Sequence, residues 1–191
     1  VMVIWTALIT FSLLWIYQIE SEQTFKLARK EALTIFKKDI SIRLWATNHG
    51  GVYVPISEKT PPNKYLKHVP ERDIATPSGK KLTLMNPAYM IRQLMKEFDE
   101  QYNIKGHITS LNLVNPDNAP DEWEHKTLKS FEDGVEEFSD IVASSVGDQF
   151  RYMRVLRIKK GCLKCHSLDG SEKKEGPNFN NINFYVSPIY M

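Results

Sequence analysis

Residues 150–166 read FRYMRVLRIKKGCLKCH, in which a predicted β-strand is followed by a Cys-x-x-Cys-His motif. Side chains alternate between two kinds of face over residues 149–158, and this period of two is typical of a strand. The motif consists of Cys162, Cys165 and His166, a spacing that serves to attach a c-type haem. The two thiols form thioethers, and the adjacent imidazole coordinates the iron. We therefore expect one covalent haem c, bound late in the chain.

Other uses of this motif fit the sequence less well. Cys162 and Cys165 are the only cysteines, and no second pair of ligands with zinc-site spacing follows them. A thioredoxin-type pair belongs early in a βαβ unit. A disulfide across two intervening residues closes too small a loop to stabilise much. No catalytic acid or base stands out, so we expect an electron carrier and no enzyme, with peroxidase chemistry the least favoured role.

The composition excludes several other classes of protein. The chain has 191 residues, 42% hydrophobic and 25% charged, which fits one ordinary domain with an additional segment. The net charge is +2, and basic residues are spread among acidic ones as on an ordinary solvated surface. The sequence contains no glycine-rich phosphate loop. We therefore expect no nucleic-acid partner.

The N-terminal stretch VMVIWTALITFSLLWIYQI, residues 1–19, contains no charged residue. As a helix it is roughly 28 Å long, close to the thickness of the hydrocarbon core of a bilayer. Trp15 and Tyr17 suit the membrane interface. A signal peptide usually has a shorter apolar region and a small-residue cleavage site, and a buried core helix usually has a polar stripe. We therefore predict a transmembrane anchor over residues 1–20.

The motif also predicts on which side of the membrane the rest of the chain lies. Haem c is normally attached on the outer side of the inner (cytoplasmic) membrane, so residues 21–191 are expected to form one periplasmic domain. The partners expected there are redox proteins or the subunits of a membrane complex, in addition to the lipid bilayer itself.

The domain is predicted to be α+β. A helix over residues 21–48 continues the span, because neither Gly nor Pro interrupts it, and it ends at Gly50 and Gly51. The other elements follow from periodicity, caps and turn residues. Up to residue 132 they are a strand at 52–56, a surface loop at 57–81, a helix beginning at Asn86 and Pro87, a strand leading into a turn at 107–116 and a helix at 121–132. After it come strands at 136–144 and 149–158, a short helix with the motif, a loop at 169–181 and a final strand at 181–189.

Several runs together resemble a known family. These are NHGGVYVP (48–55), LTLMNPAYMIRQL (82–94), GHITSLNLVNPDNAPDEWE (106–124) and FRYMRVL before CLKCH. They resemble the PAS-like mono-haem c domain of bacterial sensor kinases, chemoreceptors and small stand-alone cytochromes. The resemblance implies a PAS-like antiparallel sheet with helices and one covalent haem, with His166 as the proximal ligand. Receptor members usually continue into signalling modules, and here Met191 follows the last predicted strand closely, which favours a carrier.

The group opposite His166 is the main open question. Haem c iron in electron carriers usually has a second axial His or Met. His49 is favoured, because it ends the long helix before two glycines that allow close backbone approach. The resemblance also favours it by position, because a helix residue in about this region can serve as the distal ligand in relatives that lack the HGG run. Alternatively, His49 complements the helix dipole. His107 and Met153 are the other candidates, and a vacant sixth position would favour gas sensing.

The haem propionates need basic partners. Arg151 and Arg154 precede the motif closely and are predicted to serve, with Arg157 as a further candidate.

Two functions follow from the whole sequence. The first is a membrane-anchored mono-haem c cytochrome that transfers single electrons on the periplasmic side, and the second is a haem-based redox or gas sensor domain.

Overall fold

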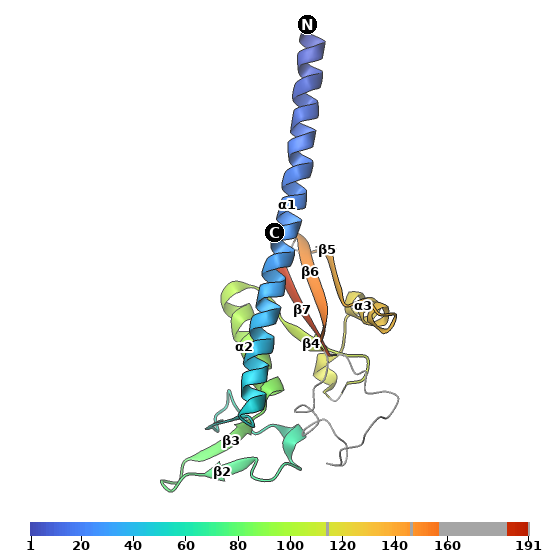
Figure 1. The fold of residues 1–191 in the computed structure, drawn as a ribbon. Helices are drawn as coiled ribbons and strands as arrows, with labels where there is room; N and C mark the ends of the chain where they lie inside the picture. The colour runs from blue at the N-terminus through green and yellow to red at the C-terminus, as the bar shows by residue number, and fades with distance from the viewer. Residues whose placement is uncertain (114, 146, 157–182, 191) are drawn as a thin grey trace.

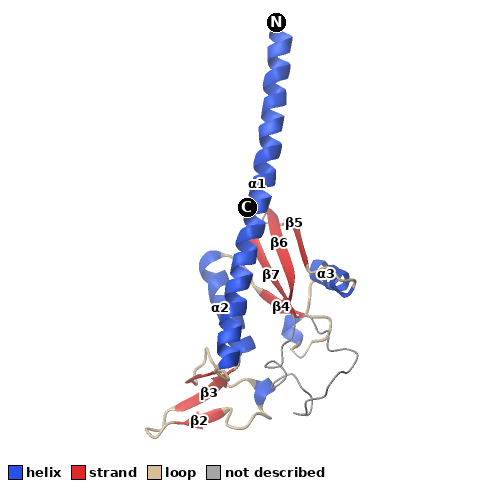
Figure 2. Cartoon of the chain, in the orientation of Figure 1, coloured by secondary structure: helices blue, strands red, loops and turns tan. Residues whose placement is uncertain are grey.

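A computed structural model describes residues 1–113, 115–145 and 147–156, and the backbone of residues 183–190. Its helices and strands form two small antiparallel sheets with helices packed on them, as Figure 2 shows, which confirms the α+β class. The elements are α1 (Met2–Asn48), β1 (Val52–Pro55), η1 (Lys64–Leu66), β2 (Asp73–Ala75), β3 (Lys81–Met85), α2 (Pro87–Tyr102), β4 (His107–Thr109), η2 (Pro116–Asn118), α3 (Glu122–Glu132), β5 (Glu137–Ser144), β6 (Gly147–Leu156) and β7 (Asn183–Tyr190).

Helix α1 is a single helix of 47 residues, so the predicted continuity between its apolar and its amphipathic part is confirmed. It ends at the predicted glycines, because Gly50 and Gly51 have φ values of +76° and +103°, which favour glycine. The apolar N-terminal part projects away from the sheets with its side chains exposed (Figure 1). By length and composition this part fits a membrane span or a signal sequence.

The larger sheet has the strand order β4-β7-β6-β5, with every neighbouring pair antiparallel. Strand β6 has the two faces that its alternation predicts. Phe150 and Tyr152 pack against Ala28 and Ala32 of α1, and Met153 on the opposite face packs against α3. The sheet is therefore enclosed between the long helix on one face and α3 on the other.

The smaller sheet has the order β1-β3-β2 and corrects the predicted surface loop at residues 57–81. That segment includes η1 and β2. Strand β2 has only three residues, too few to show a period of two, and it exists because β3 pairs with it. Buried Thr83 donates a hydrogen bond to Asp73 Oδ1 at 2.6 Å, which joins the two strands through their side chains.

Strand β4 and the bend that follows it confirm the prediction of a strand leading into a turn at residues 107–116. The chain leaves the strand after Thr109, whose hydroxyl donates to the carbonyl of Asn118 at 2.6 Å. The Ser110 hydroxyl donates to the carbonyl of Asn112 at 2.7 Å. Such local side-chain bonds compete with strand pairing, so the chain turns after the three residues of the strand.

The two shorter helices begin where their caps predict. The Asn86 side chain accepts a hydrogen bond from the Tyr89 amide at 3.0 Å, with Pro87 in the first turn. Asp121 and Glu124 form a reciprocal capping box at the start of α3. Helix α2 packs on α1 through a third apolar cluster, which contains Phe36, Ile91 and Met95.

Candidate functional site

The Cys-x-x-Cys-His motif lies outside the described residues, as do Arg157 and the short helix and loop predicted around the motif. Leu156 at the end of β6 pairs with Asn183 at the start of β7. The two described residues that flank 157–182 therefore lie side by side at one end of the larger sheet.

Helix α1 and strand β6 run in the same direction, and this fixes the relation of His49 to that end of the sheet. Phe25 contacts Phe150, and further along both elements Phe36 lies beneath the Arg154 guanidinium. From Phe36 the helix continues for about 20 Å to His49, whereas β6 continues for only about 7 Å beyond Arg154. The C-terminal end of α1, which His49 follows directly, therefore lies beyond that end of the larger sheet (Figure 1).

His49 has the hydrogen bonding expected of a metal ligand. Its Nδ1 lies 2.7 Å from the carbonyl oxygen of Trp45, and its ring packs on the indole with centroids 4.5 Å apart. A carbonyl only accepts, so Nδ1 carries the proton and Nε2 of the neutral ring keeps its lone pair. Histidines that bind metals commonly donate their other ring N–H to a backbone carbonyl in this way.

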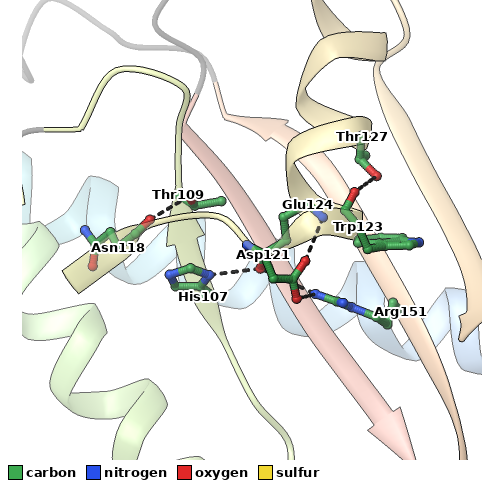
Figure 3. Close-up of polar contacts among 8 residues, drawn as sticks. All are labelled: His107, Thr109, Asn118, Asp121, Trp123, Glu124, Thr127 and Arg151. Carbon is green, nitrogen blue, oxygen red and sulfur yellow. Dashed lines mark hydrogen bonds and ion pairs between the residues drawn. The ribbon is translucent and has the colours of Figure 1, made fainter. Parts of the chain in front are cut away.

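His107 is held in a different network, which Figure 3 shows. Its Nδ1 lies 2.9 Å from Oε1 of Glu124, a carboxylate whose side chain is only 4% exposed. Glu124 Oε2 also accepts from the Asp121 amide at 2.8 Å. In the sheet, His107 lies opposite Val186, three residues past the point where β7 begins. Histidines that bind metals also commonly donate Nδ1–H to a carboxylate. His107 therefore remains the alternative candidate for the second iron ligand.

Arg151 belongs to the same network. Its Nη2 lies 2.8 Å from Asp121 Oδ2 and 3.6 Å from Glu124 Oε1, and its guanidinium lies 4.4 Å from the centre of the Trp123 ring. Burial acts to raise the pKa of Asp121. The hydrogen bond from the Glu124 amide and the charge of Arg151 outweigh burial and hold that pKa below its ordinary value.

Arg154 lies on the opposite face of β6 from Arg151 and joins the sheet to α1. Glu137 Oε2 accepts hydrogen bonds from Arg154 Nη1 at 3.1 Å and from the Tyr152 hydroxyl at 2.8 Å. Arg29 of α1 forms an ion pair with the same carboxylate. Burial raises the pKa of Tyr152, so its hydroxyl stays a donor. The two predicted propionate partners are thus both present but are not brought together.

The structure also describes the other residues that the sequence offers as possible iron ligands or as part of their surroundings. Met153 is fully buried between β6 and α3, as a core residue. His68 and His125 are exposed. Gly51 serves the fold directly, since a Cβ there would lie 2.8 Å from the Leu84 side chain on β3. Across the described part of the chain, His, Cys, Asp and Glu side chains form no group of three that could hold a metal ion.

Two carboxylates that organise this region were not predicted as functional residues. Glu124 was detectable, because Asp-x-x-Glu before an apolar run is the signature of a capping box. Glu137 was not, because its role depends on its register opposite Arg154 across β5 and β6, and register follows from tertiary pairing.

Comparisons with known proteins show one matching family and one similar solved structure. A sequence model of the Tll0287-like family (Tll0287) matches residues 21–183. The crystal structure of the cyanobacterial haem-protein Tll0287 is similar with a TM-score of 0.52 and 14% identity, over 82% of this chain and 91% of that one. A search of curated proteins found no match. At this identity the structural likeness shows the fold alone.

Proposed function

We propose that this chain, which belongs to the Tll0287-like family, is a membrane-anchored mono-haem c cytochrome that transfers single electrons on the periplasmic side. The observation that carries the proposal is the CLKCH motif in a chain whose fold is shared by a haem protein. The fold of the rest of the chain supports it, because the motif segment is tied to one end of a sheet packed on both faces.

The residues present fit a haem. Cys162 and Cys165 would form the thioethers, and His166 would be the proximal ligand. His49 is the proposed ligand on the opposite side, since its Nε2 is free to bind a metal while Nδ1 is fixed by Trp45. When bound, the haem supplies a one-electron redox couple. The protein's own contribution is to hold both imidazoles, so that little rearranges when an electron arrives.

The apolar half of α1 supports the membrane anchor in this proposal. Its side chains are exposed to solvent throughout, and covering so much apolar surface with lipid is strongly favourable. Haem c attachment on the outer side then supports a periplasmic domain at the inner membrane.

A haem-based sensor is the second candidate, and one observation favours it. Helix α1 runs without interruption from its apolar half to His49, and it packs on β6 through Ala28 and Ala32. A change at the iron could therefore be transmitted along one rigid helix toward the membrane. A sensor that binds gases needs an open or easily displaced sixth ligand, whereas a carrier keeps both ligands.

Absorption spectroscopy separates the two functions. For the purified full chain in detergent, we expect a low-spin spectrum in the ferrous state that does not change when carbon monoxide is added. Rapid binding of carbon monoxide by the unmodified protein would contradict the carrier and support the sensor. A potentiometric titration of the same sample should give one reversible one-electron step.

A further inference from the structure

Charge is unevenly distributed along the folded chain. Residues 49–85, which contain the three strands of the smaller sheet, carry six basic and three acidic residues, a net charge of +3. Residues 86–156, which contain α2, α3 and most of the larger sheet, carry seven basic and thirteen acidic residues, a net charge of −6. We call residues 49–85 the basic module.

The basic charges of the module are available to a partner. Its five lysines are exposed, and within the part of the chain that the structure describes none of their ammonium groups forms an ion pair with a carboxylate: Lys59, Lys64, Lys67, Lys80 and Lys81. Arg72 is different, because it pairs with Asp73. Apolar side chains on the same module are also partly exposed, at 38% for Tyr53 and 37% for Ile74.

The module lies far from the proposed membrane span. Glu20 follows the span, and α1 extends for roughly 40 Å from there to Asn48, where the chain turns directly into β1. Figure 1 shows the smaller sheet at the opposite end of the molecule from the N-terminus. A carrier dissolved in the bilayer stays within a layer about 30 Å thick, so it does not reach this end.

The module also borders the end of the larger sheet from which the motif segment departs. The Tyr65 hydroxyl of η1 donates to Asn115 Oδ1 at 2.9 Å, just past β4. Thr109 of β4 lies opposite Phe184, next to the first residue of β7. His49 begins the module at the end of α1. A protein that docks on the module is therefore beside the chain ends that flank the motif.

We infer that the basic module is the docking surface for a small, soluble, acidic electron-carrier protein. This inference rests on the proposed function and names the partner class for it. Complementary charge steers encounter and can raise association rates by about 10- to 1,000-fold at low salt. One electron leaves the partner's reduced centre, which is oxidised, and reduces the ferric haem. No proton or group is transferred.

Stopped-flow reduction of the haem-loaded full chain in detergent micelles tests the inference, with reduced plant-type ferredoxin as the acidic probe. The second-order rate constant should fall steeply as ionic strength rises from about 10 mM to about 300 mM. A triple variant, Lys64→Glu, Lys67→Glu and Lys80→Glu, should lower it at least about tenfold at low ionic strength. The matched control changes the same net charge elsewhere, by Lys96→Glu, Lys105→Glu and Lys129→Glu, and should lower it less than about threefold.

Equal effects of the two triple variants, or a rate constant that does not depend on ionic strength, would overturn the inference. Circular dichroism and the absorption spectrum confirm that each variant is folded and carries haem. Dithionite reduction of the same samples separates this inference from the proposed function. If dithionite does not produce a reversible one-electron change, the proposed function fails. If dithionite does produce that change, and the rate constant with ferredoxin is the same with and without the lysine substitutions, only the docking surface is refuted.

Discussion

His49 occupies a helix terminus at which two physical roles coincide. Its Nδ1 donates to the Trp45 carbonyl near the end of α1, an oxygen that also accepts from the His49 backbone N–H, and this leaves Nε2 as the free nitrogen. The position beyond the end of the larger sheet places that nitrogen on the side from which the motif segment leaves. A purely structural cap and an iron ligand would have the same local geometry, so the two roles have to be separated by a substitution.

Replacing His49 with Ala should open the sixth position of the iron. We expect the ferric spectrum to change from low-spin to high-spin and the ferrous protein to bind carbon monoxide within seconds. The control is His68→Ala, which removes an exposed imidazole and should leave both spectra unchanged. An unaltered low-spin spectrum in His49→Ala would exclude this ligand and direct attention to His107.

Asp121 stabilises the start of α3 as a helix cap and as the partner of Arg151. Asp121→Ala should lower the free energy of unfolding by about 1 kcal/mol, since it removes the cap. Asp121→Asn keeps the cap and loses the charge, so its loss should be smaller. Urea unfolding at pH 7 measures both values.

The pH dependence of the same two variants follows from the lowered pKa of Asp121. A carboxylate whose pKa is lower in the folded state contributes stability that is fully present above its unfolded pKa, about 3.9, and is lost as pH falls through the folded value. The advantage of the unmodified protein over Asp121→Asn should therefore shrink below about pH 4. An advantage that grows with acidification would contradict this sign.

Local signals made much of this residue-scale structure predictable. Asn86 was identified as a helix start because a cap needs only residues within one turn. The helix at 121–132 was identified because its apolar side chains recur on one face. Contacts between residues that are distant in sequence were not predicted. Glu137 joins Arg29, Tyr152 and Arg154 through the register of β5 on β6 and the packing of α1, and no local pattern contains either.

Strand β6 is the element on which the rest of the domain is built. Its alternation was readable in the sequence because one face packs on α1 and the other on α3, and both faces therefore select particular side chains. Strand β2 shows the opposite case. Asp73–Ala75 has three exposed residues and becomes a strand only through pairing with β3, so its sequence resembles a loop.

The contact between α1 and β6 depends on small side chains in the helix. Ala32 is fully buried against the sheet, so Ala32→Leu should overpack this interface and lower stability by about 1–3 kcal/mol. Lys30→Leu introduces the same side chain on the exposed side of the helix and should change stability by less than about 0.5 kcal/mol. Thermal unfolding of the haem-loaded proteins compares them, and similar melting temperatures for both variants would argue against close packing here.

The whole molecule is extended, with an apolar helix half at one end and the basic module at the other (Figure 1). Charge along the sequence could be counted in advance, but its separation in space could not. That separation depends on α1 being straight and on β1 to β3 forming a sheet of their own beyond its end. The length of α1 beyond the proposed membrane span therefore sets the distance between the membrane and the proposed docking surface.

Removal of residues 1–20 tests the anchor. The full chain expressed in bacteria should stay with the membrane pellet after an alkaline carbonate wash, because its apolar helix is held by lipid. A chain that begins at Ser21 behind a cleavable signal peptide should appear in the soluble periplasmic fraction with haem bound. Release of the full chain by carbonate, or an N-terminus found trimmed to about residue 20, would identify the segment as a signal sequence.

The central claim is that Cys162 and Cys165 hold a single haem covalently, and intact-protein mass spectrometry after acid denaturation tests it most directly. The chain purified from a host able to attach haem c should retain the mass of one haem, and a Cys162→Ala, Cys165→Ala variant from the same host should have the bare polypeptide mass. A bare mass for the unmodified chain, with haem either released as a free molecule or never present, would contradict the account.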